Sequence, residues 1–243
     1  LIGVRLVNGD AQLVRGGGLV VKNAAGFDIP KLMVGSLGRW GVLAELTFKV
    51  FPAAEAAVTL HIDLAGAESA VAVMNQLAGS AEQLDCLDFQ PPGRVTVRIR
   101  GTRPALPARV QRLRRLVSPE AQVQQIDEDQ GYWRDVREFA WVGPQQTLVK
   151  VPLAPPQILK MEGKLARIAG DVPRRYSAGG NVAWIAWPTE AGRDELEGLL
   201  AQLDSRGLIL RGRGPAVLVP EDRSSAFAER LLSVFDPAGK FER

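Results

Sequence analysis

The sequence contains a single cysteine and a single histidine among its 243 residues. One cysteine cannot form an internal disulfide, and it cannot supply the thiolates of an iron–sulfur centre. Cys86 lies in the strand-like stretch LDCLDF, so we expect a buried, inert thiol. The lone histidine, His61, falls beside Thr59 and Asp63 on the polar face of a predicted strand. We therefore expect a surface histidine, no metal site, and no identifiable catalytic base.

Long apolar runs are also absent. No stretch is long enough to cross a bilayer, and no cationic and apolar leader is present, so the pattern predicts a cytoplasmic chain without direct membrane insertion. The net charge of +3 is slight, and the basic residues are scattered, which argues against a nucleic-acid partner. The densest basic run, Arg109 to Arg115, is predicted as the solvated face of a helix.

Several motifs of hydrolytic and nucleotide-dependent enzymes are missing. The sequence has no H-E-x-x-H, no nucleophile elbow and no P-loop, which excludes the usual metallopeptidases, esterases and NTPases. Arg174, Arg175 and Tyr176 precede Ala178-Gly179-Gly180 and form a possible bidentate clamp for a carboxylate. The alternative, which is more frequent, is that such a pair decorates the end of a strand.

The most informative stretch runs from Gly18 to Pro52. It predicts a strand at residues 19 to 22, an irregular turn, and a short helix that Pro30 begins. Glycines follow at every third position, Gly35, Gly38 and Gly41, and residues 42 to 50 then alternate as a strand with one face in the core. The dinucleotide fingerprint G-x-G-x-x-G needs a strand before and a helix after its glycines, so a Rossmann fold is excluded.

The three glycines permit two interpretations. Residues without Cβ let backbone amides approach a phosphate or another anion closely. The alternative is a glycine-rich connection that packs under its own sheet. Spacing alone does not separate them.

The segment VKNAAGFDIPKLMVGSLGRWGVLAEL resembles the K-N-x-x-G-Y-D-x-x-x-L-x-x-G-S-x-G-x-x-G-V-x-x-E signature of FAD-linked oxidases of the vanillyl-alcohol-oxidase type. Within that family it is most similar to the FAD-binding E subunits of glycolate oxidase. The tail FDPAGKF also resembles the family ending. The resemblance implies that FAD is bound by the matching positions, which are Lys22, Asn23, Gly26, Asp28, Gly35, Ser36, Gly38, Gly41, Val42 and Glu45.

The resemblance also implies a function. It predicts an FAD-binding subunit of a complex that oxidises a 2-hydroxy acid such as glycolate and relays electrons to an iron–sulfur subunit. A catalytic flavoprotein subunit would be the second partner, and membrane association would come only through partners. The alternative is a cofactor-free scaffold of the same complex. The glycine-rich pyrophosphate loop of the family lies upstream of the stretch that Leu1 begins, so the FAD site within these residues is expected to be incomplete.

The predicted fold class is α+β, with a partial FAD-binding domain and a cap domain. From Pro52 onward the patterns give strand, helix, strand, strand, helix, strand twice over. We expect two ferredoxin-like halves that share one antiparallel sheet with helices over one face. Residues 55 to 224 would form the cap, and residues 1 to 54 with 225 to 243 the second part of the flavin domain.

Overall fold

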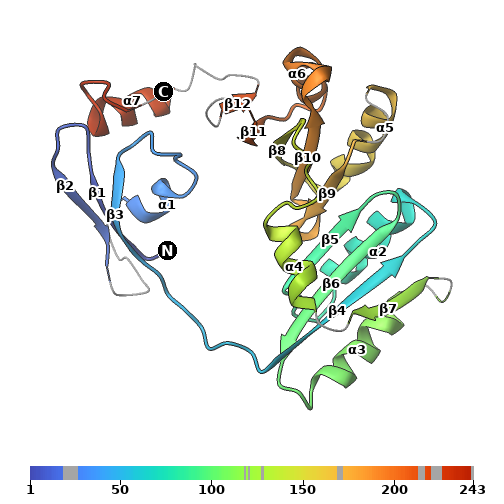
Figure 1. Ribbon diagram of the computed structural model, residues 1–243. Helices are drawn as coiled ribbons and strands as arrows, with labels where there is room; N and C mark the ends of the chain where they lie inside the picture. Colours follow the sequence, from blue (N-terminus) through green and yellow to red (C-terminus); the bar gives the residue numbers. More distant parts are fainter. Residues whose placement is uncertain are drawn as a thin grey trace. The chain divides into compact units, whose positions relative to one another are not determined.

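The computed structural model describes residues 1–18, 27–117, 119, 121–126, 129–168, 172–212, 217–219 and 226–241. The chain divides into two compact units (Figure 1). The small unit consists of Leu1–Ala53 and Asp222–Arg243, and the large unit is Ala54–Glu221. Each is described by itself.

The small unit is built on a three-stranded antiparallel sheet in the order β2-β1-β3. Its elements are β1 (Gly3–Val7), β2 (Leu13–Gly17), α1 (Ile29–Met33), β3 (Val42–Thr47) and α7 (Ala226–Phe235). β1 and β2 form a hairpin that turns at Asn8-Gly9, and the Asn8 side chain holds the turn by accepting from the amides of Asp10 and Gln12 at 3.1 and 2.8 Å.

The small unit has a compact apolar core on one face of its sheet. Val4 and Leu6 of β1 pack there with Met33 of α1, Trp40 and Phe235 of α7. The alternation of β1 explains the choice of face, because residues two apart point to the same side of a strand. The tail segment therefore contributes a helix to the same core as the first strand.

The third strand is not buried as the sequence predicts. β3 ends at Thr47 rather than at residue 50, and among the described residues it lies at an edge of the sheet, with a neighbouring strand on one side only. Val42 and Leu46 are 58% and 42% exposed, and Phe48 and Phe51 beyond the strand are 59% and 77% exposed. The prediction of a core face was wrong because alternation fixes which residues share a face but does not supply the layer that covers it.

The large unit is organised around a nine-stranded antiparallel sheet. The strand order is β12-β11-β8-β10-β9-β5-β6-β4-β7. The strands are β4 (Ala56–Asp63), β5 (Cys86–Gln90), β6 (Arg94–Gly101), β7 (Gln122–Ile126), β8 (Gln146–Pro152), β9 (Arg174–Ser177), β10 (Val182–Pro188), β11 (Gly207–Arg211) and β12 (Val217–Val219). The helices are α2 (Ala67–Ala78), α3 (Leu106–Arg115), α4 (Asp129–Arg137), α5 (Ile158–Ile168) and α6 (Arg193–Gln202).

The sheet confirms the two ferredoxin-like halves. In the first half the order is β5-β6-β4-β7, and in the second it is β9-β10-β8-β11, which is the same arrangement of the four strands of a β-α-β-β-α-β unit. The halves join where β5 pairs with β9, at Phe89 and Tyr176, whose rings stack at 5.4 Å. We call this junction the seam.

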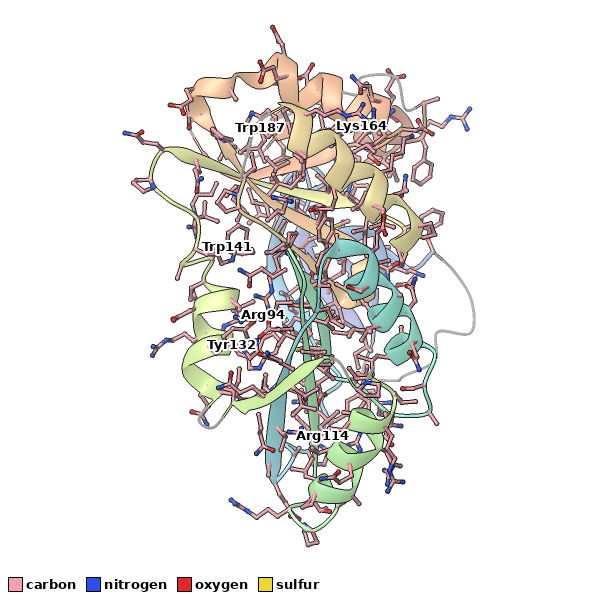
Figure 2. All side chains as sticks on the ribbon, turned by 90° about the vertical axis from the view of Figure 1, so that its right-hand side faces the viewer. Arg94, Arg114, Tyr132, Trp141, Lys164 and Trp187 are labelled. Carbon is pink, nitrogen blue, oxygen red and sulfur yellow. The ribbon has the colours of Figure 1, made fainter. Side chains whose placement is uncertain are left out.

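One face of the sheet carries the main apolar core. Figure 2 shows the sheet edge-on, with α2, α3 and α5 on one side and α4 on the other. The helices α2, α3, α5 and α6 bury their leucine, valine and methionine faces against alternate residues of the strands, such as Val97 of β6 and Ile185 of β10. This helix layer matches the predicted one.

The other face carries an element that the sequence analysis missed. Residues 129 to 137 form α4 and pack on this face (Figure 1). Its apolar positions are few, so an apolar stripe at helical spacing was not detectable. In the described residues no helix is both long and apolar enough to cross a membrane.

Candidate functional site

The predicted cofactor glycines lie in the loop between α1 and β3 of the small unit. Gly35 and Gly38 have φ values of +80° and +83°, and a Cβ built on either would meet nothing within 4 Å. Gly41 has φ +148°, and a Cβ there would lie 2.7 Å from the carbonyl oxygen of Val7. Gly41 is therefore required by packing against β1. Gly35 and Gly38 adopt the left-handed conformation on open surface, where a ligand has access to the backbone.

The amides of this loop are partly occupied. Ser36, Arg39 and Gly41 donate their N–H groups to the carbonyl oxygens of Met33, Ser36 and Gly38, at 3.2, 3.1 and 3.4 Å. A cradle in which all the amides converge on one anion is therefore not formed. The two sequence interpretations each hold in part: the loop folds on itself, and its two left-handed glycines remain open.

The other predicted site residues have separate roles in the structure. Asp28 caps α1, because its Oδ1 accepts from the amide of Lys31 at 3.1 Å. Ser36 is buried, Val42 is exposed at the start of β3, and Glu45 forms an exposed ion pair with Arg5 at 2.8 Å. Lys22, Asn23 and Gly26 lie outside the described residues, as does the strand predicted at residues 19 to 22.

A second candidate region is the face of the large sheet under α4, which is rich in buried polar groups. His61 is only 7% exposed, so the prediction of a surface histidine was wrong. Its strand position is polar as expected, but α4 covers it, and its ring meets that of Tyr132 edge-on at 4.9 Å. Burial lowers the pKa of His61, and the nearby Arg94 and Arg175 lower it further while Asp63 opposes them.

Polar contacts attach α4 to the sheet. Asp129, at the start of the helix, accepts from the hydroxyl of Thr59 at 2.7 Å and pairs with the guanidinium of Arg98 at 3.0 and 3.2 Å. The indole of Trp133 donates to the same Thr59 hydroxyl at 2.8 Å. Tyr132 lies on the sheet side of the helix (Figure 2). We call this set of contacts the α4 latch.

The two adjacent arginines of β9 point to opposite faces of the sheet. Arg174 pairs with Glu162 of α5 on the helix side, through Nε at 2.7 Å, and the Tyr176 hydroxyl donates to the same carboxylate. Arg175 lies on the α4 side and is 5% exposed. A joint clamp by both guanidinium groups is therefore excluded, because successive residues of a strand alternate in direction.

Arg175 forms a buried ion pair. Its Nε donates to Asp88 at 2.7 Å, and its Nη2 donates to the hydroxyl of Tyr132 at 2.7 Å. Burial raises the pKa of the Asp88 carboxyl, and Arg175 opposes that rise. The Arg175 Nη1 group makes no hydrogen bond to the part of the chain that the structure describes.

A cavity of about 330 Å³ opens between α4 and the sheet at the seam. It is lined by Gln90, Pro91, Tyr132, Asp135, Val136, Trp141, Val172, Pro173, Arg174 and Arg175. We call it the seam cavity. The indole Nε1 of Trp141 is buried with no hydrogen-bond partner among the described residues, a state that costs about 1–3 kcal/mol.

A larger cavity of about 710 Å³ adjoins the seam cavity and shares Val136, Trp141 and Arg175 with it. Cys86 lies on its wall. Cys86 is half-buried rather than buried as predicted. Burial raises the pKa of its thiol to about 11, so the thiol is protonated near neutrality.

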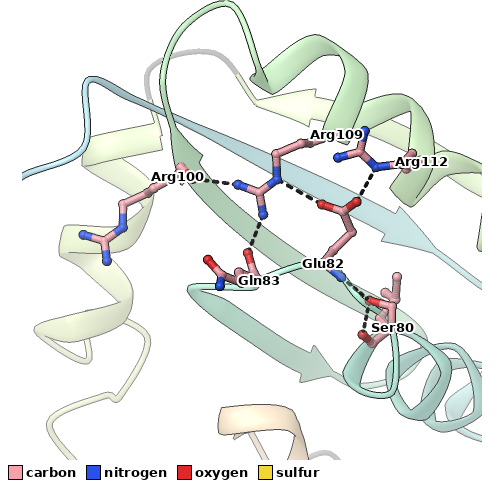
Figure 3. Close-up of polar contacts among 7 residues, drawn as sticks. Ser80, Glu82, Gln83, Arg100, Arg109 and Arg112 are labelled. Carbon is pink, nitrogen blue, oxygen red and sulfur yellow. Dashed lines mark hydrogen bonds and ion pairs between the residues drawn. The ribbon is translucent and has the colours of Figure 1, made fainter.

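The basic run of α3 is an internal ion-pair cluster rather than a solvated face alone. Figure 3 shows Arg109 and Arg112 converging on Glu82, at 2.9 and 2.5 Å. Arg109 also donates to the carbonyl oxygens of Arg100 and Gln83, both at 2.7 Å. These hydrogen bonds lower the pKa of Glu82. The cluster ties α3 to the segment after α2 and is structural.

No family model matches the chain. In sequence, the chain is 43% identical over 64 residues to glycolate oxidase subunit GlcE of Escherichia coli. The matched segment covers 26% of this chain and 18% of that protein. The chain is 37% identical over 60 residues to glycolate oxidase subunit GlcD of Bacillus subtilis, which covers 25% of this chain and 13% of that protein. The matched segments are thus short parts of longer relatives.

In fold, the chain is similar to two solved structures. One is 4-ethylphenol oxidase from Gulosibacter chungangensis, with a TM-score of 0.67 and 15% identity over 97% of this chain and 63% of that one. The other is alkyldihydroxyacetonephosphate synthase, with a TM-score of 0.61 and 12% identity over 98% of this chain and 52% of that one. The chain spans about half to two thirds of the length of these structures.

The chain resembles the class of FAD-linked oxidases: its α+β architecture with antiparallel sheets is similar to that of solved structures such as 4-ethylphenol oxidase. Its similarity to the glycolate oxidase subunits GlcE and GlcD places the resemblance within that class. The predicted resemblance is confirmed.

Proposed function

We propose that this chain is an FAD-binding subunit of a glycolate-oxidase-like complex. The observation that carries the proposal is the 43% identity to GlcE over 64 residues, in a chain whose fold is that of larger oxidases. In this proposal the small unit supplies part of the flavin domain and the large unit is the cap. Electrons taken from a 2-hydroxy acid would pass to an iron–sulfur subunit, beside a catalytic flavoprotein subunit.

The geometry of the small unit supports a role in holding the flavin. Gly35 and Gly38 present backbone without side chains on open surface, which suits close approach of a phosphate or of the flavin ring system. The exposed apolar residues of β3 follow directly after the loop. When bound, FAD would accept a hydride from the substrate, and the residues of this chain would bind and orient the cofactor.

A second candidate function is a cofactor-free scaffold of the same complex. Three amides of the loop donate hydrogen bonds to carbonyl groups of the same segment, those of Ser36, Arg39 and Gly41, which favours this alternative. A scaffold would need the loop only as a connection between α1 and β3. The two functions differ in whether substitution of an open glycine changes the flavin content of the complex.

The experiment that tests the proposal is reconstitution of the complex with and without this chain. A catalytic flavoprotein subunit and an iron–sulfur subunit of the glycolate oxidase type are purified together, and glycolate-dependent reduction of a dye is measured. We expect this chain to copurify with them and to be required for turnover. Full turnover without the chain, or no association with the other two, would refute the proposal.

A further inference from the structure

The seam cavity has the size of a site for a small anion, and an arginine lies on its wall. Its charged lining residues are Arg174, Arg175 and Asp135. Because Arg174 pairs with Glu162 on the helix side, Arg175 is the arginine whose guanidinium lies on the α4 side of the sheet. The cavity volume of about 330 Å³ lies at the lower end of the range for ligand pockets, which suits a small acid.

Arg175 is held ready to bind a carboxylate. Asp88 and Tyr132 fix its guanidinium through Nε and Nη2, and neither contact uses Nη1. Two aromatic rings of α4 pack against the same guanidinium. The Cζ of Arg175 lies 5.4 Å from the ring centroid of Tyr132 and 5.7 Å from that of Trp133. A guanidinium that is already fixed loses little conformational freedom when it binds an anion.

Trp141 supplies a second donor at the same wall. Its Nε1 is buried and has no acceptor in the described part of the chain, although Trp141 lines both cavities. Buried donors are almost always satisfied, so an unpaired one beside a cavity indicates a missing acceptor. Figure 2 shows Trp141 on the α4 side of the sheet.

We propose that the seam cavity binds a small monocarboxylate of the 2-hydroxy acid class, with the carboxylate on Arg175 and an oxygen on Trp141. The site lies wholly within the large unit. The choice of a 2-hydroxy acid rests on the proposed function, but the anion site rests on the cavity alone. Arg175 and Trp141 are thus substrate-positioning residues.

The test is calorimetric titration of the full chain with glycolate, using glycolamide as the neutral analogue. Arg175→Lys keeps the charge that compensates Asp88 but loses the planar fork, and Trp141→Phe removes only the indole donor. We expect glycolate binding to weaken about tenfold or more in Arg175→Lys and severalfold in Trp141→Phe, as charge-assisted and neutral hydrogen bonds are lost. Arg112→Lys, which alters an ion pair away from the cavity, should bind as the wild type does.

The outcomes separate this proposal from the proposed function, because the titration needs no flavin. Glycolate binding that both cavity variants weaken supports the site even if the chain never holds FAD. Equal binding of glycolamide and glycolate, unchanged binding in Arg175→Lys with its circular dichroism intact, or no binding of glycolate by the wild type would overturn it. Acetate serves as a probe of the hydroxyl: binding as tight as that of glycolate would overturn the 2-hydroxy acid assignment.

Discussion

Glu82 shows how single residues join elements that the sequence leaves separate. Its carboxylate accepts from both Arg109 and Arg112 and is 10% exposed, so these charge-assisted hydrogen bonds form in a partly desolvated environment (Figure 3). Sequence alone predicts Arg109 and Arg112 on one face of a helix, but the acidic partner comes from a different segment. The solvated-face prediction was therefore incomplete, because pairing across the fold carries no signature in local spacing.

Glu82→Gln tests the strength of this cluster. Glutamine keeps one acceptor but removes the charge, so we expect a loss of about 1–3 kcal/mol in the free energy of unfolding, measured by urea denaturation at pH 7. Glu138→Gln changes a 68% exposed carboxylate and should cost almost nothing. Because the arginines lower the folded-state pKa of Glu82 below its ordinary 4.5, the difference between wild type and variant should persist above that pH and disappear as the pH falls through the folded value. Equal stabilities at pH 7 would contradict the account.

His61 makes a second prediction at the scale of one residue. Its folded-state pKa is below the ordinary 6.5, so near and below that pH the unfolded chain binds more protons than the folded one. Stability should therefore fall as the pH drops through 6.5, until the folded-state pKa is passed. In His61→Gln this part of the pH dependence should vanish, as measured by urea unfolding between pH 7.5 and 5. Since His61 is the only histidine, an unchanged slope would show that another group titrates.

At the scale of elements, α4 differs from the other helices of the large unit in how it is attached. The helices α2, α3, α5 and α6 are held by the apolar core, whereas Asp129, Thr59 and Arg98 hold α4 through the polar contacts of the latch. Helices of the first kind are visible in sequence as apolar stripes, and all four were predicted. The latch depends on partners some 30 to 70 positions away in the chain, so local spacing does not reveal it and α4 was not predicted.

Asp129→Asn should loosen α4 selectively. The substitution removes the charge that pairs with Arg98 and retains one acceptor for Thr59, so we expect a loss of about 2 kcal/mol, within the range for a partly buried pair. Hydrogen exchange should become faster in residues 129–137 and stay unchanged in the strands below. Asp135→Asn, at a 64% exposed position of the same helix, is the matched control. Uniformly faster exchange across the sheet would show that the latch is not a local attachment.

At the scale of the whole molecule, the two ferredoxin-like halves followed from the sequence and the site did not. Strict alternation in residues 94 to 100 and the helical stripes between strands sufficed for two ferredoxin-like halves. In contrast, the exposure of β3 and the burial of His61 depend on what covers a face, which alternation does not encode. In the sequence, the Arg174-Arg175 pair indicated only a possible carboxylate clamp. The structure was needed to show that the two side chains point to opposite faces of the sheet.

The small unit leaves an apolar strand at the edge of its sheet, and the loop before it keeps two open left-handed glycines. These two features together are what the proposed flavin role explains. If FAD covers the loop, a side chain at Gly38 must displace it. The same side chain also strains the backbone, because φ of +83° disfavours residues with a Cβ, so the comparison needs a control with equal strain.

The most direct test is the flavin content of the assembled complex carrying Gly38→Val or Gly192→Val in this chain. Gly192 has φ +76° and ψ 164°, a conformation that essentially only glycine adopts, so a side chain there is strained at least as much. Its surroundings are equally open, but it lies in the large unit. We expect Gly38→Val to lower the FAD bound per complex and the glycolate-dependent activity, with Gly192→Val near the wild type. Unchanged flavin content in a Gly38→Val complex that assembles normally would contradict the account and favour the scaffold.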